Sequence, residues 1–106
     1  MTNVPAVAGA DDRVAQHVVN ADNDDVRVTT WTFEASGAAT GHHRHEFDYV
    51  VVPVTGGRFE VVDVDGSVRE MDQVSGSPYL GTAGTAHDVV SAATQRAVFV
   101  EIELKR

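Results

Sequence analysis

The sequence predicts an all-β fold, either a sandwich or a closed barrel. Short runs of β-branched and aromatic residues recur along the chain, turn-forming residues separate these runs, and no long segment has the period of a helix. Many short strands have many polar edges, which must be paired or covered. A jelly-roll β-barrel satisfies this requirement, so it is the architecture that we expect.

Eight segments are predicted to be strands, because each is a short β-branched or aromatic run bounded by turn residues. In chain order they are Arg13–Val19, Val26–Phe33, Phe47–Val54, Gly57–Val64, Ser67–Met71, Pro78–Gly81, His87–Ser91 and Ala97–Leu104. The intervening segments tolerate turns or positive φ: Asn20–Asp25, Ser36–Gly41, Gly56–Gly57, Asp65–Gly66, Ser75–Ser77 and Thr82–Ala86. We expect a single domain over residues 13–106, preceded by a loosely ordered N-terminal segment, residues 1–12.

The pair Asp65–Gly66 is the clearest turn signal. It lies between EVVDV and SVREM, two runs that are predicted to be strands. Asp-Gly favours a two-residue type I′ turn, in which both central residues have positive φ. We therefore expect an antiparallel hairpin with this turn.

The run Tyr49–Val54 is apolar on both faces, unlike a strand with one side in water. Its outward residues Val50 and Val52 would then pack on something beyond the strand. We expect a second copy of the chain, in a homodimer. The alternative is that the N-terminal strand or a loop covers them.

Composition excludes several classes of protein. No apolar run approaches the roughly 20 residues that span a bilayer, so we expect no membrane partner. The formal net charge is −8, with no basic cluster, which argues against nucleic acid. The chain has no cysteine, so any bound metal must take nitrogen and oxygen ligands. The first residues have neither a basic leader nor a long apolar stretch, and the expected location is cytoplasmic.

Four of the five histidines are clustered or stand near a predicted strand start: His42, His43 and His45 in GHHRHE, and His87 in GTAHDV. In an extended segment, His43, His45, Phe47 and Tyr49 point to one face and Arg44, Glu46 and Asp48 to the other. Two imidazoles one residue apart can share a divalent ion with a third ligand from a facing strand, and His87 is the natural third. His42 has the wrong parity and is expected at the rim, and His17 has no partner.

These residues resemble the first of the two motifs of the cupin superfamily, G-x5-H-x-H-x3-4-E-x6-G. Gly37, His43, His45 and Gly56 occupy its positions, whereas Tyr49 stands where the motif has glutamate. The runs HRHEFDYVVVPVTGG and AVFVEIELK are similar to a group of small bacterial cupins known as β-alanine degradation proteins.

The second motif, G-x5-P-x-G-x2-H-x3-N, is matched by Gly76, Gly84 and His87. Thr82 and Ser91 stand in its proline and asparagine positions. The resemblance implies a double-stranded β-helix, or jelly-roll, barrel that is often dimeric. It also implies a metal ion on three histidines inside the barrel and a substrate that enters at the barrel mouth.

The resemblance does not supply a fourth ligand, because a neutral phenol is a poor one. We expect Tyr49 to point inward, with its hydroxyl acting as a catalytic group or hydrogen-bonding a bound water. The carboxylates of Glu46 and Asp48 are the alternatives, although strand parity argues against both. Water is the remaining candidate for the fourth position.

The expected cofactor is one divalent ion, namely Fe, Mn, Zn, Ni or Co, on His43, His45 and His87. The leading hypothesis is a metal-dependent oxygenase of the dioxygenase type that acts on a small organic substrate. One alternative is a lyase, isomerase or hydrolase that uses Tyr49 as general acid or base. Another is a non-catalytic cupin that binds a small molecule.

Several inward side chains are candidates for the substrate wall, with plain core packing as the alternative: Trp31, Phe33, Phe47, Tyr79 and Phe99. Arg58 and Glu101 would orient a polar substrate if they face inward.

Overall fold

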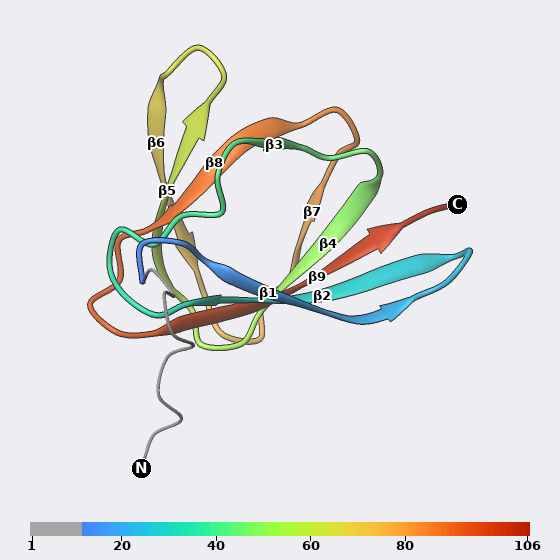
Figure 1. Cartoon of the computed structure of the whole chain (residues 1–106), viewed down its shortest axis with the longest axis horizontal. Helices are drawn as coiled ribbons and strands as arrows, with labels where there is room; N and C mark the ends of the chain where they lie inside the picture. Colours follow the sequence, from blue (N-terminus) through green and yellow to red (C-terminus); the bar gives the residue numbers. More distant parts are fainter. Residues whose placement is uncertain (1–11) are drawn as a thin grey trace.

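The computed structural model describes residues 12–106, which form nine strands (Figure 1). The strands are β1 (Gln16–Asp22), β2 (Val26–Phe33), β3 (His43–Arg44), β4 (Asp48–Pro53), β5 (Gly57–Asp63), β6 (Val68–Gln73), β7 (Tyr79–Gly81), β8 (Ala86–Ser91) and β9 (Ala97–Leu104). The expectation of a loosely ordered start falls almost entirely on residues outside this range. Within residues 12–106, no helix is long and apolar enough to cross a membrane.

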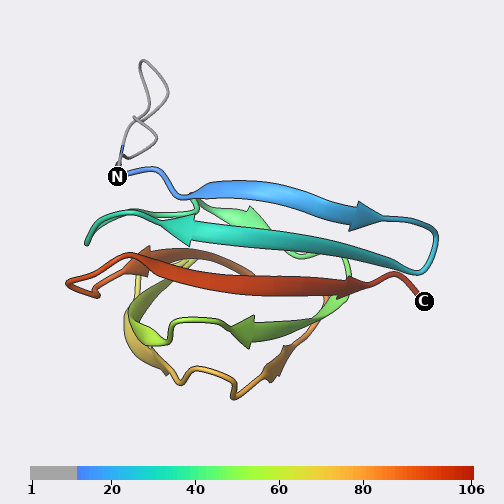
Figure 2. The same ribbon diagram turned by 90° about the horizontal axis from the view of Figure 1, so that it is seen from below.

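The strands form two antiparallel sheets. The five-stranded sheet has the order β1-β2-β9-β4-β7, and the four-stranded sheet has the order β3-β8-β5-β6 (Figures 1 and 2). Neighbours in a sheet come from distant parts of the chain, as in the pairing of β2 with β9 and of β5 with β8. The prediction of an all-β jelly roll is confirmed.

The first predicted strand is placed wrongly by three residues. The strand is not Arg13–Val19 but Gln16–Asp22, and Asn20–Asp22 belong to it rather than to the turn. The pairing with β2 continues past a bulge between Val19 and Ala21 and ends where Asp22 faces Arg27. The turn then starts at Asn23, whose Oδ1 accepts hydrogen bonds from the amides of Asp25 and Val26.

The β5–β6 hairpin is present, but the prediction of a type I′ turn is wrong. Gly66 has a φ of 87°, whereas no residue other than glycine has positive φ in the part of the chain described, so Asp65 does not meet the type I′ requirement. The Gly66 amide bonds the Asp63 carbonyl at 2.9 Å, and the Asp63 amide bonds the Ser67 carbonyl at 2.9 Å. This pattern fits a three-residue loop that ends in a glycine bulge. Asp65 caps the loop by accepting from the Ser67 amide at 2.9 Å.

The space between the sheets is apolar at one end of the strands and polar at the other. The apolar end is centred on Phe33, Phe59 and Phe99, whose ring centroids lie 5.1 to 5.8 Å apart. In the four-stranded sheet, the paired residues change from Phe59 and Ser91, through Val61 and Val89, to Asp63 and His87. In β9 the inward residues change from Phe99 to Glu101 and Glu103. The strands therefore bring polar side chains together at one end of the barrel.

Candidate metal centre

His43 and His87 come from neighbouring strands and face each other directly in the β3–β8 pair. The Nδ1 atom of His43 lies 2.8 Å from the Gly41 carbonyl oxygen, which can only accept a hydrogen bond. Nδ1 therefore carries the proton, and in the neutral ring Nε2 keeps its lone pair. The local backbone thus selects the tautomer that can bind a metal through Nε2.

His45 follows β3 and is held by the loop before β8. Its amide bonds the Thr85 carbonyl at 2.8 Å, and its carbonyl accepts from the Gly84 amide at 2.8 Å. Its ring is stacked on the ring of Tyr49, with centroids 3.8 Å apart and planes 18° apart. Backbone and side chain contacts together fix the direction in which the imidazole points.

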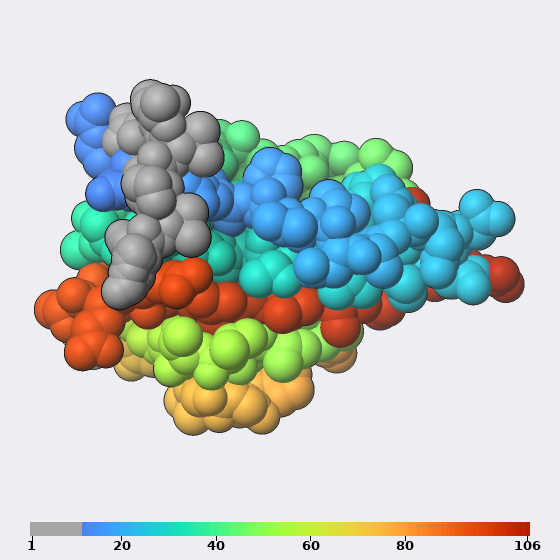
Figure 3. Space-filling model, turned by 60° about the horizontal axis from the view of Figure 1, so that its bottom comes forward, coloured from blue at the N-terminus to red at the C-terminus, as the bar shows by residue number. Residues whose placement is uncertain are grey.

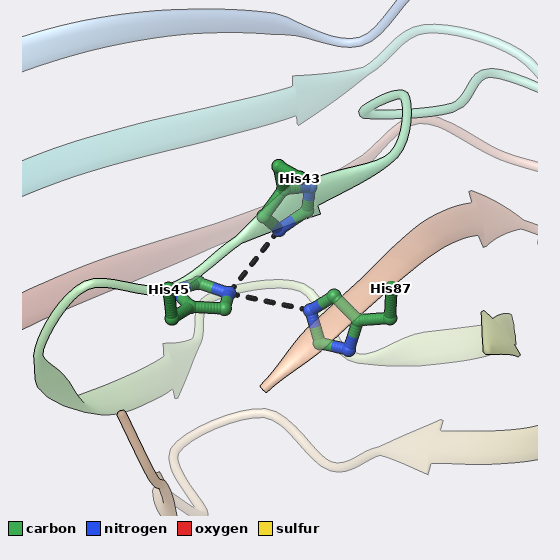
Figure 4. Close-up of side chains that lie close together, drawn as sticks. All are labelled: His43, His45 and His87. Carbon is green, nitrogen blue, oxygen red and sulfur yellow. Dashed lines mark hydrogen bonds between the residues drawn. The ribbon is translucent and has the colours of Figure 1, made fainter. Parts of the chain in front are cut away.

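The three imidazoles converge on one point (Figure 4). The Nε2 atom of His45 lies 3.1 Å from that of His43 and 3.2 Å from that of His87. Three nitrogens that each bind one ion at about 2.1 Å lie roughly 3.0 to 3.4 Å apart in octahedral or tetrahedral geometry. A proton on His45 can be donated to only one neighbour, whereas a divalent cation accepts all three lone pairs. The donor set therefore fits a metal ion.

Burial keeps two of these rings in the neutral form that binds a metal. The loss of water around His45 and His87, together with repulsion from His43, lowers the pKa of each from 6.5 to about 4. Both rings are consequently neutral at neutral pH, and a neutral ring is the form that binds a metal.

Strand parity predicted these side chains correctly. His45 and Tyr49 are buried and His43 is half-buried, whereas Arg44, Glu46 and Asp48 are exposed. Asp48 accepts a hydrogen bond from the Ala83 amide at 2.8 Å. His42 is exposed, as expected of a rim residue. His17 contacts the Trp31 ring, with centroids 4.8 Å apart, and takes no part in the cluster.

Tyr49 lies beside the histidines, but its ring is parallel to that of His45. Burial and the nearby Glu101 carboxylate raise its pKa to about 12. Opposite Tyr49 in the sheet is Gly81, where a Cβ atom would come within 2.0 Å of the Tyr49 ring. Gly81 has no role predicted from the sequence, although a glycine in a predicted strand is a signal of close approach.

A cavity of about 320 Å³ opens beside His87. Its apolar wall comes from both sheets and includes Val51, Val61, Met71, Val89 and Phe99. The polar lining includes Tyr49, Arg69, Tyr79, Thr85 and Glu101. Of the aromatic residues expected in a substrate wall, Tyr79 and Phe99 line the cavity, whereas Phe33 is fully buried in the core.

Of the two charged residues considered for substrate binding, only Glu101 faces inward. Desolvation and the charge of Glu103 raise its pKa from 4.5 to about 7. Arg58 instead lies outside, with its side chain 55% exposed and its Nε atom 3.1 Å from Asp72. Arg69, for which the sequence predicted no role, lies on the inner face of its sheet because it pairs with the buried Val61, and it lines the cavity although its side chain is 58% exposed.

Fold and site together define a small antiparallel β-barrel with three convergent histidines at its polar end. No family model matches the chain. The chain is 46% identical over 87 residues to the β-alanine degradation protein BauB of Pseudomonas aeruginosa, covering 82% of this chain and 90% of that protein. It is 38% identical to a cupin domain from Bordetella pertussis, with a TM-score of 0.83 over 92% of this chain and 100% of that one.

A double-stranded β-helix protein from Klebsiella pneumoniae shares the fold, with a TM-score of 0.72 and 16% identity over 96% of this chain and 83% of that one. The chain belongs to the cupin superfamily.

Proposed function

We propose that this protein is a metal-dependent cupin enzyme that binds one divalent ion on His43, His45 and His87 and acts on a small organic molecule. The observation that carries the proposal is the convergence of three Nε2 atoms, with contacts of 3.1 and 3.2 Å, beside the cavity. The candidate ions are Fe, Mn, Zn, Ni and Co.

Oxygenase chemistry is the leading form of this proposal. His43, His45 and His87 would hold an Fe(II) ion with positions left open, and such an ion would supply the chemistry that activates dioxygen toward an organic substrate. The cavity wall supplies an apolar surface for the substrate. Tyr49, with its pKa raised to about 12, is protonated at neutral pH, so its proposed catalytic role is that of a hydrogen-bond donor or acid.

A non-redox reaction is the second candidate, and the polar lining of the cavity favours it. In that case a Zn(II) or Mn(II) ion polarises a carbonyl group or a water molecule. The name of the Pseudomonas relative associates that protein with β-alanine degradation. A small polar acid or amine as the substrate of this chain is consistent with the Arg69 and Glu101 side chains in the cavity. A non-catalytic cupin that binds such a molecule is the third candidate.

Elemental analysis of untagged protein, purified without chelators, tests the metal site. We expect close to one ion per chain in the wild type, none in His45→Ala, and an unchanged content in His42→Ala, because His42 points outward. An iron result leads to an oxygen-uptake assay, whereas activity that persists without oxygen and follows Zn or Mn supports the non-redox reaction. Equal metal loss in both variants, or none in any protein after reconstitution, contradicts the proposal.

We also propose that two copies of the chain associate through the outer face of the five-stranded sheet. Paired residues form two largely apolar rows across this face: Val28, Ile102, Val50 and Leu80, and Val18, Thr30, Val100 and Val52. Figure 3 shows β1, β2, β9 and β4 side by side on this face. Val18 and Leu80 are 61% and 78% exposed, a large apolar exposure for a protein surface.

A further inference from the structure

The position that carries glutamate in the first motif is occupied by Tyr49, so the centre lacks the acidic residue expected on β4. Three neutral imidazoles leave the full charge of a divalent ion uncompensated in a buried site, which is costly. A carboxylate close to the histidines reduces this cost. Such a carboxylate must come from another residue close to the cluster.

The two carboxylates nearest in sequence do not meet this need. Glu46 and Asp48 are both exposed, and Asp48 is engaged by the Ala83 amide at 2.8 Å. Tyr49 does not meet it either, because its ring lies flat against His45, with planes 18° apart, and its phenol is neutral.

Glu101, on the central strand β9, does meet this need. Its Oε2 atom lies 4.0 Å from Nε2 of His45, and its side chain is 12% exposed. The ligand atoms that lie within 4.8 Å of one another are those of the three histidines, without Glu101. A separation of 4.0 Å from His45 Nε2 suits a carboxylate that reaches the ion through a bridging water. Glu101 lines the cavity, and the nearby Trp31 side chain favours its charged form.

We propose that Glu101 is the acidic residue of the metal centre, supplied by β9 in place of the carboxylate that the motif places on β4. Its negative charge stabilises the ion on His43, His45 and His87, and its oxygen accepts a hydrogen bond from a water bound to the ion. This proposal rests on the proposed function, because it requires that the three histidines bind a metal.

The test is the affinity of the metal-free protein for Zn(II) and Co(II), measured by competition with a chromophoric chelator. Glu101→Gln keeps the size of the side chain and removes its charge, and we expect it to weaken binding about 10- to 100-fold. Glu103→Gln is the matched control, two residues along on the same face of β9, where the Glu103 side chain faces Arg27 at 3.4 Å. Glu103→Gln and Asp48→Asn are expected to bind within about threefold of the wild type.

The outcomes separate the two proposals. If the wild type binds metal and Glu101→Gln binds it equally well, the role of Glu101 is overturned and the three-histidine site stands. If Asp48→Asn loses affinity while Glu101→Gln does not, the acidic residue lies on β4 after all. If the wild type binds neither ion, both proposals fall. Thermal unfolding of each metal-free variant shows whether a loss of affinity reflects unfolding, and Glu101→Asp, which restores the charge, should recover part of the affinity.

Discussion

Burial acts in opposite directions on the titratable side chains around the histidine cluster. It lowers the pKa of His45 and His87 to about 4, because a buried imidazolium loses its hydration. It raises the pKa of Glu101 to about 7, because a buried carboxylate loses its hydration as well. The metal-free site therefore favours neutral side chains, and its stability must depend on pH.

The sign of this dependence follows from proton uptake by the folded and unfolded chains. As the pH falls from about 6.5 to 4, the unfolded chain protonates His45 and His87 while the folded chain does not, so the free energy of unfolding decreases. Between about pH 7 and 4.5, Glu101 has the opposite effect, because the folded chain takes up the proton first. The two histidines have a larger effect than the single glutamate. We therefore expect the free energy of unfolding to decrease by on the order of 1 kcal/mol for each pH unit between pH 6.5 and 4.5.

Urea denaturation of the metal-free protein at pH 7.5, 6.0 and 5.0 measures this loss. Glu101→Gln removes the opposing group, so its stability should fall about twice as steeply over the same range. A wild type that gains stability on acidification would show that the histidines are already charged in the folded state.

The residues of the cluster differ in how far the sequence predicts them. His43, His45 and His87 are predictable, because motif spacing identifies them and strand parity gives their direction. Glu101 is not, because its contact with His45 joins two segments that are distant in sequence and depends on the pairing of β9 with β4. Parity places Glu101 on the inner face, but only the sheet order places it beside the histidines.

At the scale of strands, a glycine on β7 supports the histidine cluster, because it has no side chain that would clash with a ring on β4. Gly81 pairs directly with Tyr49, and this leaves room for the ring that stacks on His45. In an ordinary strand, alanine is more favourable than glycine by roughly 0.5 to 1 kcal/mol. At this position the preference is reversed, because the added methyl would overlap the ring.

We expect Gly81→Ala to lower the free energy of unfolding by about 1 to 3 kcal/mol, as overpacking of a core does. Chemical denaturation measures this change. Val64→Ala is the control, at a 76% exposed valine in the loop between β5 and β6, and it should change stability by no more than about 0.5 kcal/mol. In a Tyr49→Ala background, Gly81→Ala should cost almost nothing, and a full cost there would show that the strain lies in the backbone of β7.

Strand prediction succeeds where the pattern is long and regular. β2 and β9 have the predicted bounds, because each is an eight-residue β-branched or aromatic run that ends at a clear change of composition. β1 is displaced because its last residues, Asn20–Asp22, are held in the sheet by pairing rather than by propensity. β3 was not predicted, because its two residues are too few to show a pattern in the sequence and only the pairing with β8 defines the strand.

At the scale of the whole molecule, the two faces of the five-stranded sheet have different tasks. At one end its inner face carries part of the aromatic core, and at the other it carries Tyr49 and Glu101, which face His45. The outer face carries the two apolar rows, with Val100 near their centre on β9. β1 and β2 extend this sheet, and every residue of β1 is exposed within the single chain. A second copy packed on the outer face would remove these apolar side chains from water.

Val100→Glu tests this arrangement, because it places a charge in the middle of the proposed interface. In a monomer the new carboxylate stays in water and the fold is retained, whereas in a dimer the two charges are buried near the symmetry axis. We expect the free energy of dimerisation to become less favourable by at least about 3 kcal/mol, which raises the dimer dissociation constant more than 100-fold. Val68→Glu is the control, at a 57% exposed valine that pairs with Val62 on the outer face of the other sheet. Sedimentation equilibrium should show dimers for the wild type and Val68→Glu and monomers for Val100→Glu, whereas a wild type that is monomeric at micromolar concentration rules the interface out.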